Sequence, residues 1–540
     1  MEEEENIQGN LSARIAEKNL AETLSEDRLK EIGSECKAGF DADLQSRSHW
    51  ENDLDEWTKL AMQARENKST PWQNASNVKY PVLSTASMQF NARAYPSLVP
   101  ADGKIVKGKT IGKDPTSEKG QKADRVATYM SYQLMHEMQG WDEDMDKLLM
   151  MLPIVGTVFK KTYWDGGSKG IKSELVHPKN FIVNNWAYSL ETAERTSEVI
   201  EMSQRVFEER KRQKLFLDVD LGAPTNEPPR NQSKDAPSRV DDTTPYILIE
   251  QHTYLDLDED GYKEPYIVTF HKNTGKVVRI VARYEMDGIE LNDKGEISRI
   301  VPTQYYTKYS FVPNPDGSFY DIGFGTLLGP INEAINTLIN QLVDAGTLSN
   351  LQSGFIGKGL RLKTGDEKFK PGEWKPVPSS GSDLKNQIVP LPVREPSNVL
   401  FELMGALISS GKELASVAEI FVGKMPGQNT PATTTMATIE QGMKVFTAVY
   451  KRIYRSLDKE FKKVYNLNHV YLNPETYANI LDIPVGPDDF DVKSYDVCPG
   501  ADPTAMSNTE RLMKAQGLME MLPACGPMMN PVEVLQRVLQ

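Results

Sequence analysis

The sequence has few cysteines, the residues that cross-link a domain through disulfides or bind structural zinc. Its three cysteines, Cys36, Cys498 and Cys525, lie far apart, and no CxxC pair occurs. This spacing indicates neither a disulfide framework nor a zinc site. We therefore expect a protein that assembles in a reducing, cytosolic compartment.

Patterns typical of catalysis are also missing. No pair of histidines has HxH or HExxH spacing, and no Gly-x-Ser-x-Gly element is present. The six histidines are scattered: His49, His136, His177, His252, His271 and His469. We predict no catalytic residues, no cofactor and no metal, and hence a protein that is not an enzyme.

Long apolar runs and an excess of positive charge are absent too. No run approaches the roughly 18 residues that span a bilayer, and Glu2–Glu5 make the N-terminus unlike a secretory signal. We therefore expect no membrane partner. The net charge is -14, whereas a protein that grips nucleic acid usually carries a basic patch. The acidic surface is either simply solvated or one along which DNA keeps moving.

The 540 residues suffice for about three or four domains, and 39% apolar with 26% charged residues is a globular composition. Apolar periodicity predicts a mixed α+β chain. Helices are expected within 1–67 and over 82–96, 119–152 and 191–216; strands over 104–112, 153–186 and 246–309; and a solvated linker over 218–245.

The pattern becomes regular and helical from residue 323 to residue 352. A heptad seam runs through Leu328, Ile331, Ile335, Leu338, Leu342 and Ala345. Beside it a polar stripe recurs every four residues, at Asn332, Asn336, Asn340 and Asp344. The stripe either lines a channel or forms a contact face between subunits.

Two further helices are expected after this one. The first begins near Ser397, a plausible N-cap, and ends near Gly423. After a loop over 423–435 comes a longer helix over 436–467. Its apolar face is expected at Ile439, Met443, Phe446, Tyr450, Ile453, Leu457, Phe461 and Val464, and its basic outer face at Lys444, Lys451, Arg452, Arg455, Lys459, Lys462 and Lys463.

Two motifs match known sites by spacing alone. Residues Gly103–Thr110 match the Walker A spacing, but neither Pro100 before them nor Pro115 after them suits the strand–loop–helix context of a phosphate site. Asp256–Gly261 imitates the start of an EF-hand, but Ile267 stands where a bidentate Glu is needed. We predict a basic two-strand excursion and a β-hairpin turn, respectively.

Several short segments, in this order and spacing, resemble tailed-bacteriophage portal proteins, and together they cover most of residues 70–470. They are Pro71–Pro81, Gln89–Pro96, Asn314–Tyr320, Gly329–Glu333, Asn340–Thr347, Pro371–Lys375, Leu391–Pro396, Gly427–Thr433 and Glu440–Gly442. Within these proteins, the segments are most similar to the podophage-type portals, which are head-to-tail connectors. Residues 218–245 and those beyond 470 match little.

The resemblance implies the portal fold, in a ring of twelve identical subunits. Its parts would be an N-terminal wing part (1–322), stem helices (323–352 and 396–422), a β-containing clip (353–395), a tunnel loop (423–435), a long helix with the rest of the wing (436–499) and a helical crown (500–540). Because no helix-stop signal precedes Gln540, we expect the natural product to continue or this crown to be truncated.

The resemblance also implies the sites and partners. The channel would use the stripe above and the tunnel-loop residues Lys424, Gln428, Asn429 and Thr430, which either touch phosphates or are only solvated. Terminase or adaptor proteins would dock on clip residues Lys358, Arg361, Lys363, Lys368, Lys370 and Trp374. Expected partners are double-stranded viral DNA, the terminase large subunit, adaptor or tail proteins, and major capsid and scaffolding proteins.

The resemblance thus predicts a virion protein at one capsid vertex, assembled in the host cytoplasm, through which DNA is packaged and ejected. Two alternatives stay open. One is a P-loop ATPase using Gly103–Thr110, with Lys109 on phosphate. The other is a capsid scaffold or adaptor without a DNA channel.

Overall fold

The computed structural model describes residues 11–64, 72, 75–100, 103–109, 118–224, 230, 244–259, 261–292, 297–350, 354–356, 388–390, 397–414, 432–481, 489–490, 497–500 and 517. The chain forms two compact units. Unit 1 comprises residues 1–58, 87–326 and 424–540; unit 2 comprises residues 59–86 and 327–423. The mixed α+β class predicted from periodicity is confirmed.

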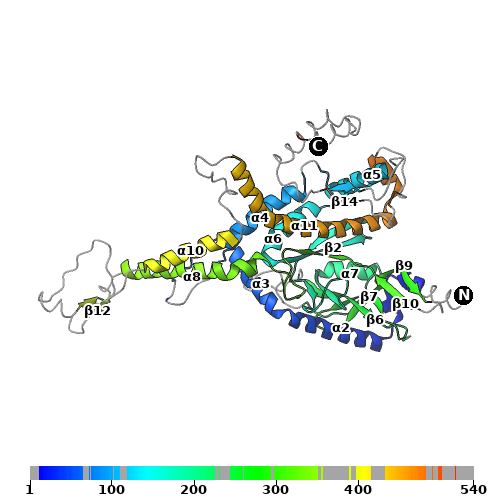
Figure 1. The fold of residues 1–540 in the computed structure, drawn as a ribbon. Helices are drawn as coiled ribbons and strands as arrows, with labels where there is room; N and C mark the ends of the chain where they lie inside the picture. Colours follow the sequence, from blue (N-terminus) through cyan, green and yellow to red (C-terminus); the bar gives the residue numbers. More distant parts are fainter. Residues whose placement is uncertain are drawn as a thin grey trace. The chain divides into compact units, whose positions relative to one another are not determined.

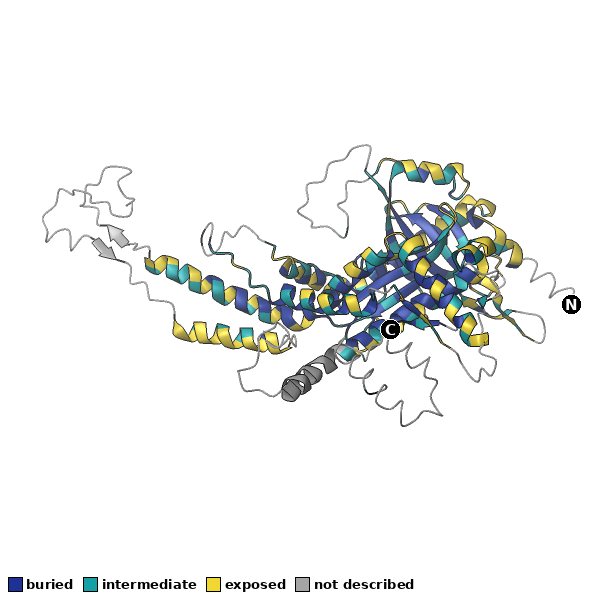
Figure 2. Ribbon diagram, turned by 90° about the horizontal axis from the view of Figure 1, so that it is seen from above, coloured by how far each residue is buried: buried dark blue, intermediate teal, exposed yellow. Residues whose placement is uncertain are grey.

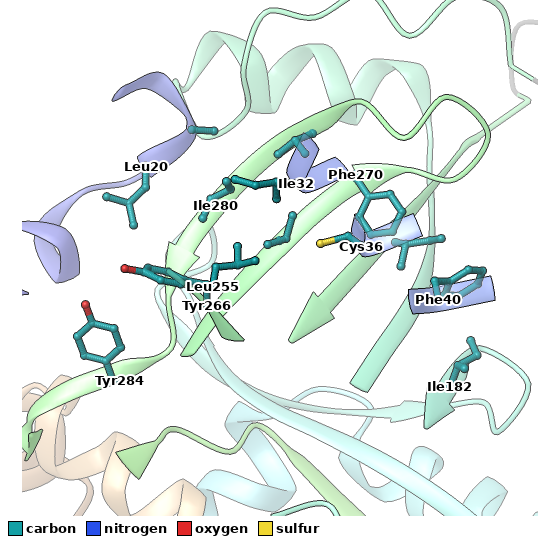
Figure 3. Packing of buried hydrophobic residues seen from close by; sticks show 14 of the residues in the cluster. Leu20, Ile32, Cys36, Phe40, Ile182, Leu255, Tyr266, Phe270, Ile280 and Tyr284 are labelled. Atoms are coloured by element: carbon teal, nitrogen blue, oxygen red, sulfur yellow. The ribbon is translucent and has the colours of Figure 1, made fainter. Parts of the chain in front are cut away.

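The largest sheet of unit 1 is antiparallel, in the order β4-β5-β6-β7-β8. Figure 1 shows β6 and β7 of this sheet beside α2. Its strands are β4 (Phe181–Val183), β5 (Thr196–Met202), β6 (Tyr246–Leu255), β7 (Glu264–His271) and β8 (Val277–Ala282). Helix α2 (Glu26–Ser46), N-capped by Ser25, packs Ile32, Cys36 and Phe40 into one core with this sheet (Figure 3). Burial of this apolar surface is the main stabilising contribution.

A second antiparallel sheet has the order β11-β2-β3. Its strands are β11 (Tyr306–Ser310), β2 (Thr157–Asp165) and β3 (Gly170–Val176). Helices α6 (Trp141–Val155) and α11 (Ala432–Tyr471) pack against it. The predicted apolar face of α11 is confirmed where side chains are described, because Tyr450, Ile453, Leu457, Phe461 and Val464 are buried.

Smaller elements complete unit 1. They are η1 (Leu20–Thr23), β1 (Val106–Gly108) paired with β14 (Val497–Pro499), α5 (Glu118–Tyr132), the π-helix η2 (Gln133–Glu137), α7 (Gln204–Arg212), β9 (Tyr284–Leu291) paired with β10 (Ile297–Pro302), and α12 (Pro474–Leu481). In the described part of the chain, no helix has the length and apolar character needed to cross a membrane.

Unit 2 holds two long helices, α8 (Phe324–Asn350, from Leu327 on) and α10 (Asn398–Leu414). It also contains the last residues of α3 (Ser48–Ala61), the first of α4 (Val82–Leu98) and the strand pair β12 (Gly354–Ile356) and β13 (Ile388–Pro390). The sequence-based division assigned residues 59–86 to the wing. The structure groups them with α8 and α10, for the reason given below.

Two predictions of secondary structure are wrong. The single helix expected over 119–152 is interrupted, because Gly140 has a φ of 86°, a left-handed conformation that ends a helix. The helix expected over 191–216 begins only at Gln204. Residues Thr196–Met202 instead form β5, where pairing with β6 outweighs the charged, helix-like pattern.

Candidate functional site

The polar stripe of α8 binds the backbone of a neighbouring segment. The side-chain oxygens of Asp344, Asn340 and Asn336 accept hydrogen bonds from backbone N–H groups at 2.9, 2.7 and 2.7 Å. Asn332 accepts two more, at 3.2 and 3.4 Å. The donors, in the same order, are the N–H groups of Ser76, Val78 and Tyr80, and then of Val82 and Leu83. We call these four side chains the asparagine ladder.

Matching periods make the ladder possible. Four helical residues rise about 6 Å, and two extended residues span about 6.6 Å, so every fourth side chain of α8 meets every second N–H of residues 76–82. Pro81 falls at a position whose N–H the ladder does not use, and its missing donor therefore costs nothing. Asn340 also donates to the carbonyl of Val78 at 3.1 Å and thereby fixes the register of this segment.

The ladder corrects the prediction for the stripe. Asn332, Asn336 and Asn340 are 1%, 6% and 5% exposed within the single chain, and Asp344 is half-buried. Amides buried against the chain's own backbone line no channel and form no face between subunits. The stripe correctly indicated that these residues have a polar partner, and that partner is the backbone of residues 76–83.

Helix α10 has the opposite character. Nine of its seventeen residues are Val, Leu, Phe, Met, Ala or Ile, yet only Gly411 is buried. A Cβ built on Gly411 would lie 3.5 Å from side-chain atoms of Ile331 and Val82, which places this turn of α10 close to the rest of unit 2. Val399 and Phe401 are 70% and 65% exposed. In Figure 2, which colours exposed residues yellow, most of this helix is exposed or intermediate. Among the described residues, this apolar helix face therefore has no partner, which is typical of an interaction surface.

Unit 1 contains a buried ionic centre that the sequence reasoning missed. The carboxylate of Glu460, on α11, accepts hydrogen bonds from Lys160 Nζ at 2.9 Å, Trp141 Nε1 at 2.8 Å and Ser173 Oγ at 2.6 Å, and from the hydroxyl of Tyr309. Burial opposes the charge of Glu460, but Lys160 and these hydrogen bonds lower its pKa. The available signal was an acidic residue on the apolar face of a helix, directly before Phe461.

A second buried network lies where the two sheets of unit 1 meet. Lys161 Nζ binds Glu198 at 2.7 Å and Glu250 at 2.8 Å, and the Tyr306 hydroxyl donates to Glu198 at 2.7 Å. Burial lowers the pKa of neighbouring His252 to about 4. Burial opposes the charge of Lys161, but its two carboxylate partners raise its pKa. These satisfied pairs join β2 of one sheet to β5 and β6 of the other.

One lysine predicted on the basic outer face of α11 turns inward. The ammonium of Lys463 donates to the carbonyl of Tyr306 and to Thr307 Oγ1, the latter at 2.8 Å. Burial lowers its pKa to about 7. The prediction for Lys463 is therefore wrong, whereas Lys451, Arg455 and Lys459 are exposed.

The Walker-like segment lacks the geometry of a phosphate loop over its described residues, 103–109. Its centre is strand β1, which pairs antiparallel with β14. Gly108 packs so closely on α5 that an added Cβ would lie 2.8 Å from the backbone of Ala123. The strand thus occupies the place where a phosphate-binding turn would have to be.

The EF-hand-like segment is the tip of the β6–β7 hairpin, as predicted. Leu255 pairs with Glu264 across it, and the N–H of Gly261 donates to Asp256 Oδ2 at 3.0 Å. The described residues contain no group of three or more His, Cys, Asp and Glu side chains placed to hold a metal ion.

The remaining predicted site residues lie outside the described residues. These are the tunnel-loop residues Lys424, Gln428, Asn429 and Thr430, and the clip residues Lys358, Arg361, Lys363, Lys368, Lys370 and Trp374. Comparison with known proteins adds no relative: no family model matches the chain, and no curated protein matches it.

Proposed function

We propose that this chain is a portal subunit, twelve copies of which form a ring at one capsid vertex through which double-stranded viral DNA is packaged and ejected. The observation that carries the proposal is α10, an apolar helix exposed beside α8. Neighbouring copies would cover this face, as the ring requires. The family resemblance of residues 70–470 supplies the kind of assembly.

The charges of α8 and α10 suit a passage for DNA. The two helices carry one cation, Lys412, against four carboxylates: Glu333, Asp344, Glu402 and Glu413. Contacts of Lys and Arg with phosphates provide most non-specific affinity for DNA. A passage lined by these helices would let a duplex slide. With the asparagine ladder buried, exposed acids such as Glu333 and Glu402 take the channel role first given to the amides.

The size of such a ring fits a duplex. Twelve helices about 10 Å across give a circumference of roughly 120 Å and a bore near 28 Å. With grooves about 8.5 and 7.5 Å deep, B-form DNA is roughly 20 Å across and passes. In this proposal, residues 353–395 dock the terminase and adaptor or tail proteins, residues 423–435 surround the duplex, and capsid and scaffolding proteins contact the outside of the ring.

Negative-stain electron microscopy of the purified full chain tests the proposal. We expect rings with a central hole. Compact particles without a hole would favour the scaffold or adaptor alternative. ATP turnover that Lys109→Ala abolishes would favour the ATPase. Either result contradicts the portal proposal.

A further inference from the structure

Two aromatic side chains stand in solvent on one loop of unit 1, between β4 and β5. Trp186 is 90% exposed and Tyr188 is 89% exposed. Between them Ala187 packs against a buried cluster, and Leu190 beyond them is 6% exposed and part of that cluster. The loop therefore alternates anchoring residues with displayed aromatic residues.

The loop is held firmly from beneath. Asn184 Nδ2 donates to Asp43 Oδ1 at 2.9 Å, and the N–H of Asn185 donates to Ser46 Oγ at 3.1 Å. The carbonyl of Asn185 accepts from the N–H of Phe319 at 3.0 Å. A partner would therefore meet aromatic side chains on an ordered backbone, and binding would cost little loop entropy.

The chemistry of the loop selects a basic partner. Tryptophan and tyrosine are enriched among the residues that dominate interface energetics. Their ring faces also attract cations, arginine above all. The same loop continues into the exposed carboxylates of Glu191 and Glu194. Glu191 already binds Lys459 at 2.9 Å, so a cation is accepted at this edge within the chain itself.

Helix α7 offers the matching surface. Its end is the basic run Arg210, Lys211 and Arg212, followed by Lys214. Arg212 and Lys214 are exposed, and neither makes an ion pair with the described residues. The helix is fixed in place by its Ser203 N-cap and by the buried side chain of Phe207.

The aromatic loop and α7 lie at opposite ends of one strand. The loop leads into β5 at Thr196, and α7 follows its end at Met202. Seven strand residues span about 23 Å. Complementary patches at separate places on one subunit form a head-to-tail contact, the type that closes into rings.

We propose that the loop of residues 184–195 docks on the basic end of α7 of the next copy. This inference rests on the proposed ring and names one of its contacts. Trp186 and Tyr188 receive the guanidinium and ammonium groups of Arg212 and Lys214 on the neighbour, with Glu194 as the countercharge.

Two double variants of the full chain test the contact. One carries Trp186→Ala with Tyr188→Ala, the other Arg212→Glu with Lys214→Glu. In sedimentation velocity we expect each to need at least tenfold more protein to form rings. An equimolar mixture of the two double variants should form dimers again, because the unchanged loop of one variant can dock on the unchanged α7 of the other. All four side chains are exposed, so melting temperatures should match the wild type.

Matched controls separate this contact from general surface effects. Tyr132→Ala with Val470→Ala removes exposed apolar groups from α5 and α11, and Lys30→Glu with Lys147→Glu reverses exposed charges elsewhere. Both should assemble like the wild type. If all variants form rings as the wild type does, the contact is wrong and the ring stands. If the wild type forms no ring, both proposals fail.

Discussion

The two units of the chain distribute polar and apolar side chains in opposite ways. Unit 1 buries an apolar core, with α2 packed on a five-stranded sheet, and also buries charged pairs such as Lys160–Glu460. Unit 2 buries a row of amides on α8 and leaves the apolar residues of α10 in solvent. Unit 1 thus has closed apolar cores and exposes aromatic side chains on one loop, whereas the described residues of unit 2 leave a whole apolar helix face exposed.

The difference indicates where contacts between copies would form in the proposed ring. Hydrogen bonds within the chain fix the register of α8 against residues 75–83 before any neighbour arrives, since backbone and side chain saturate each other. The apolar surface of α10 then remains available for contact between copies. Four variants can break or sharpen this comparison.

The largest effect is expected from Glu460→Ala in unit 1. It leaves the ammonium of Lys160 buried without its carboxylate, and removing one partner of a buried pair costs about 3–5 kcal/mol. Urea unfolding followed by circular dichroism measures the loss. Glu143→Ala, on the exposed side of α6, is the matched control and should change little. If Glu460→Ala lowers the free energy of unfolding no more than the control does, the buried centre does not hold α11 in place.

Acid should weaken unit 1 through His252. Its folded pKa of about 4 lies below the ordinary 6.5, so the unfolded chain binds a proton that the folded chain excludes. Stability is then full above pH 6.5 and is lost as the pH falls toward 4, by up to about 3 kcal/mol. Unfolding free energies measured from pH 7 to 4 test this. His252→Gln should reduce the slope without abolishing it, because burial also lowers the pKa of His177 to about 4. An unchanged slope would contradict the assignment.

Periodicity in the sequence predicted an element correctly where its apolar residues only needed to be buried. The apolar face of α11 was predicted correctly because Ile453, Leu457 and Val464 have no other function than to be buried. The strand β5 was missed because pairing with β6 depends on residues about fifty positions away. The left-handed backbone of Gly140 could not be predicted, since an isolated glycine is also tolerated within a helix.

The asparagine stripe shows a second limit of prediction from sequence. Its spacing correctly indicated a row of polar partners along α8, but a side-chain amide binds solvent, a neighbour or the chain's own backbone equally well. Only the structure shows that residues 75–81 run beside it, outside any helix or strand. The buried Glu460 was missed because its four donors come from four separate elements.

A smaller, local effect is expected from Asn336→Ala in the ladder. The N–H of Tyr80 loses its acceptor, and an unsatisfied buried donor costs about 1–3 kcal/mol. Hydrogen exchange should accelerate at Tyr80, although alanine favours the helix itself. Gln341→Ala, exposed on the same helix, is the control. Unchanged exchange at Tyr80 would mean that the ladder does not hold this segment.

The smallest effect on stability is expected from Val399→Ser with Phe401→Ser on α10. Both side chains are already in solvent, so their loss should change the unfolding free energy by less than about 0.5 kcal/mol. Leu328→Ser on α8 removes a fully buried side chain and should cost about 2–5 kcal/mol. If the exposed face exists for assembly, the α10 variant should unfold like the wild type yet fail to form rings in sedimentation velocity. A variant that loses stability but still assembles would show that α10 is covered within its own chain, and the contrast between the two units would then disappear.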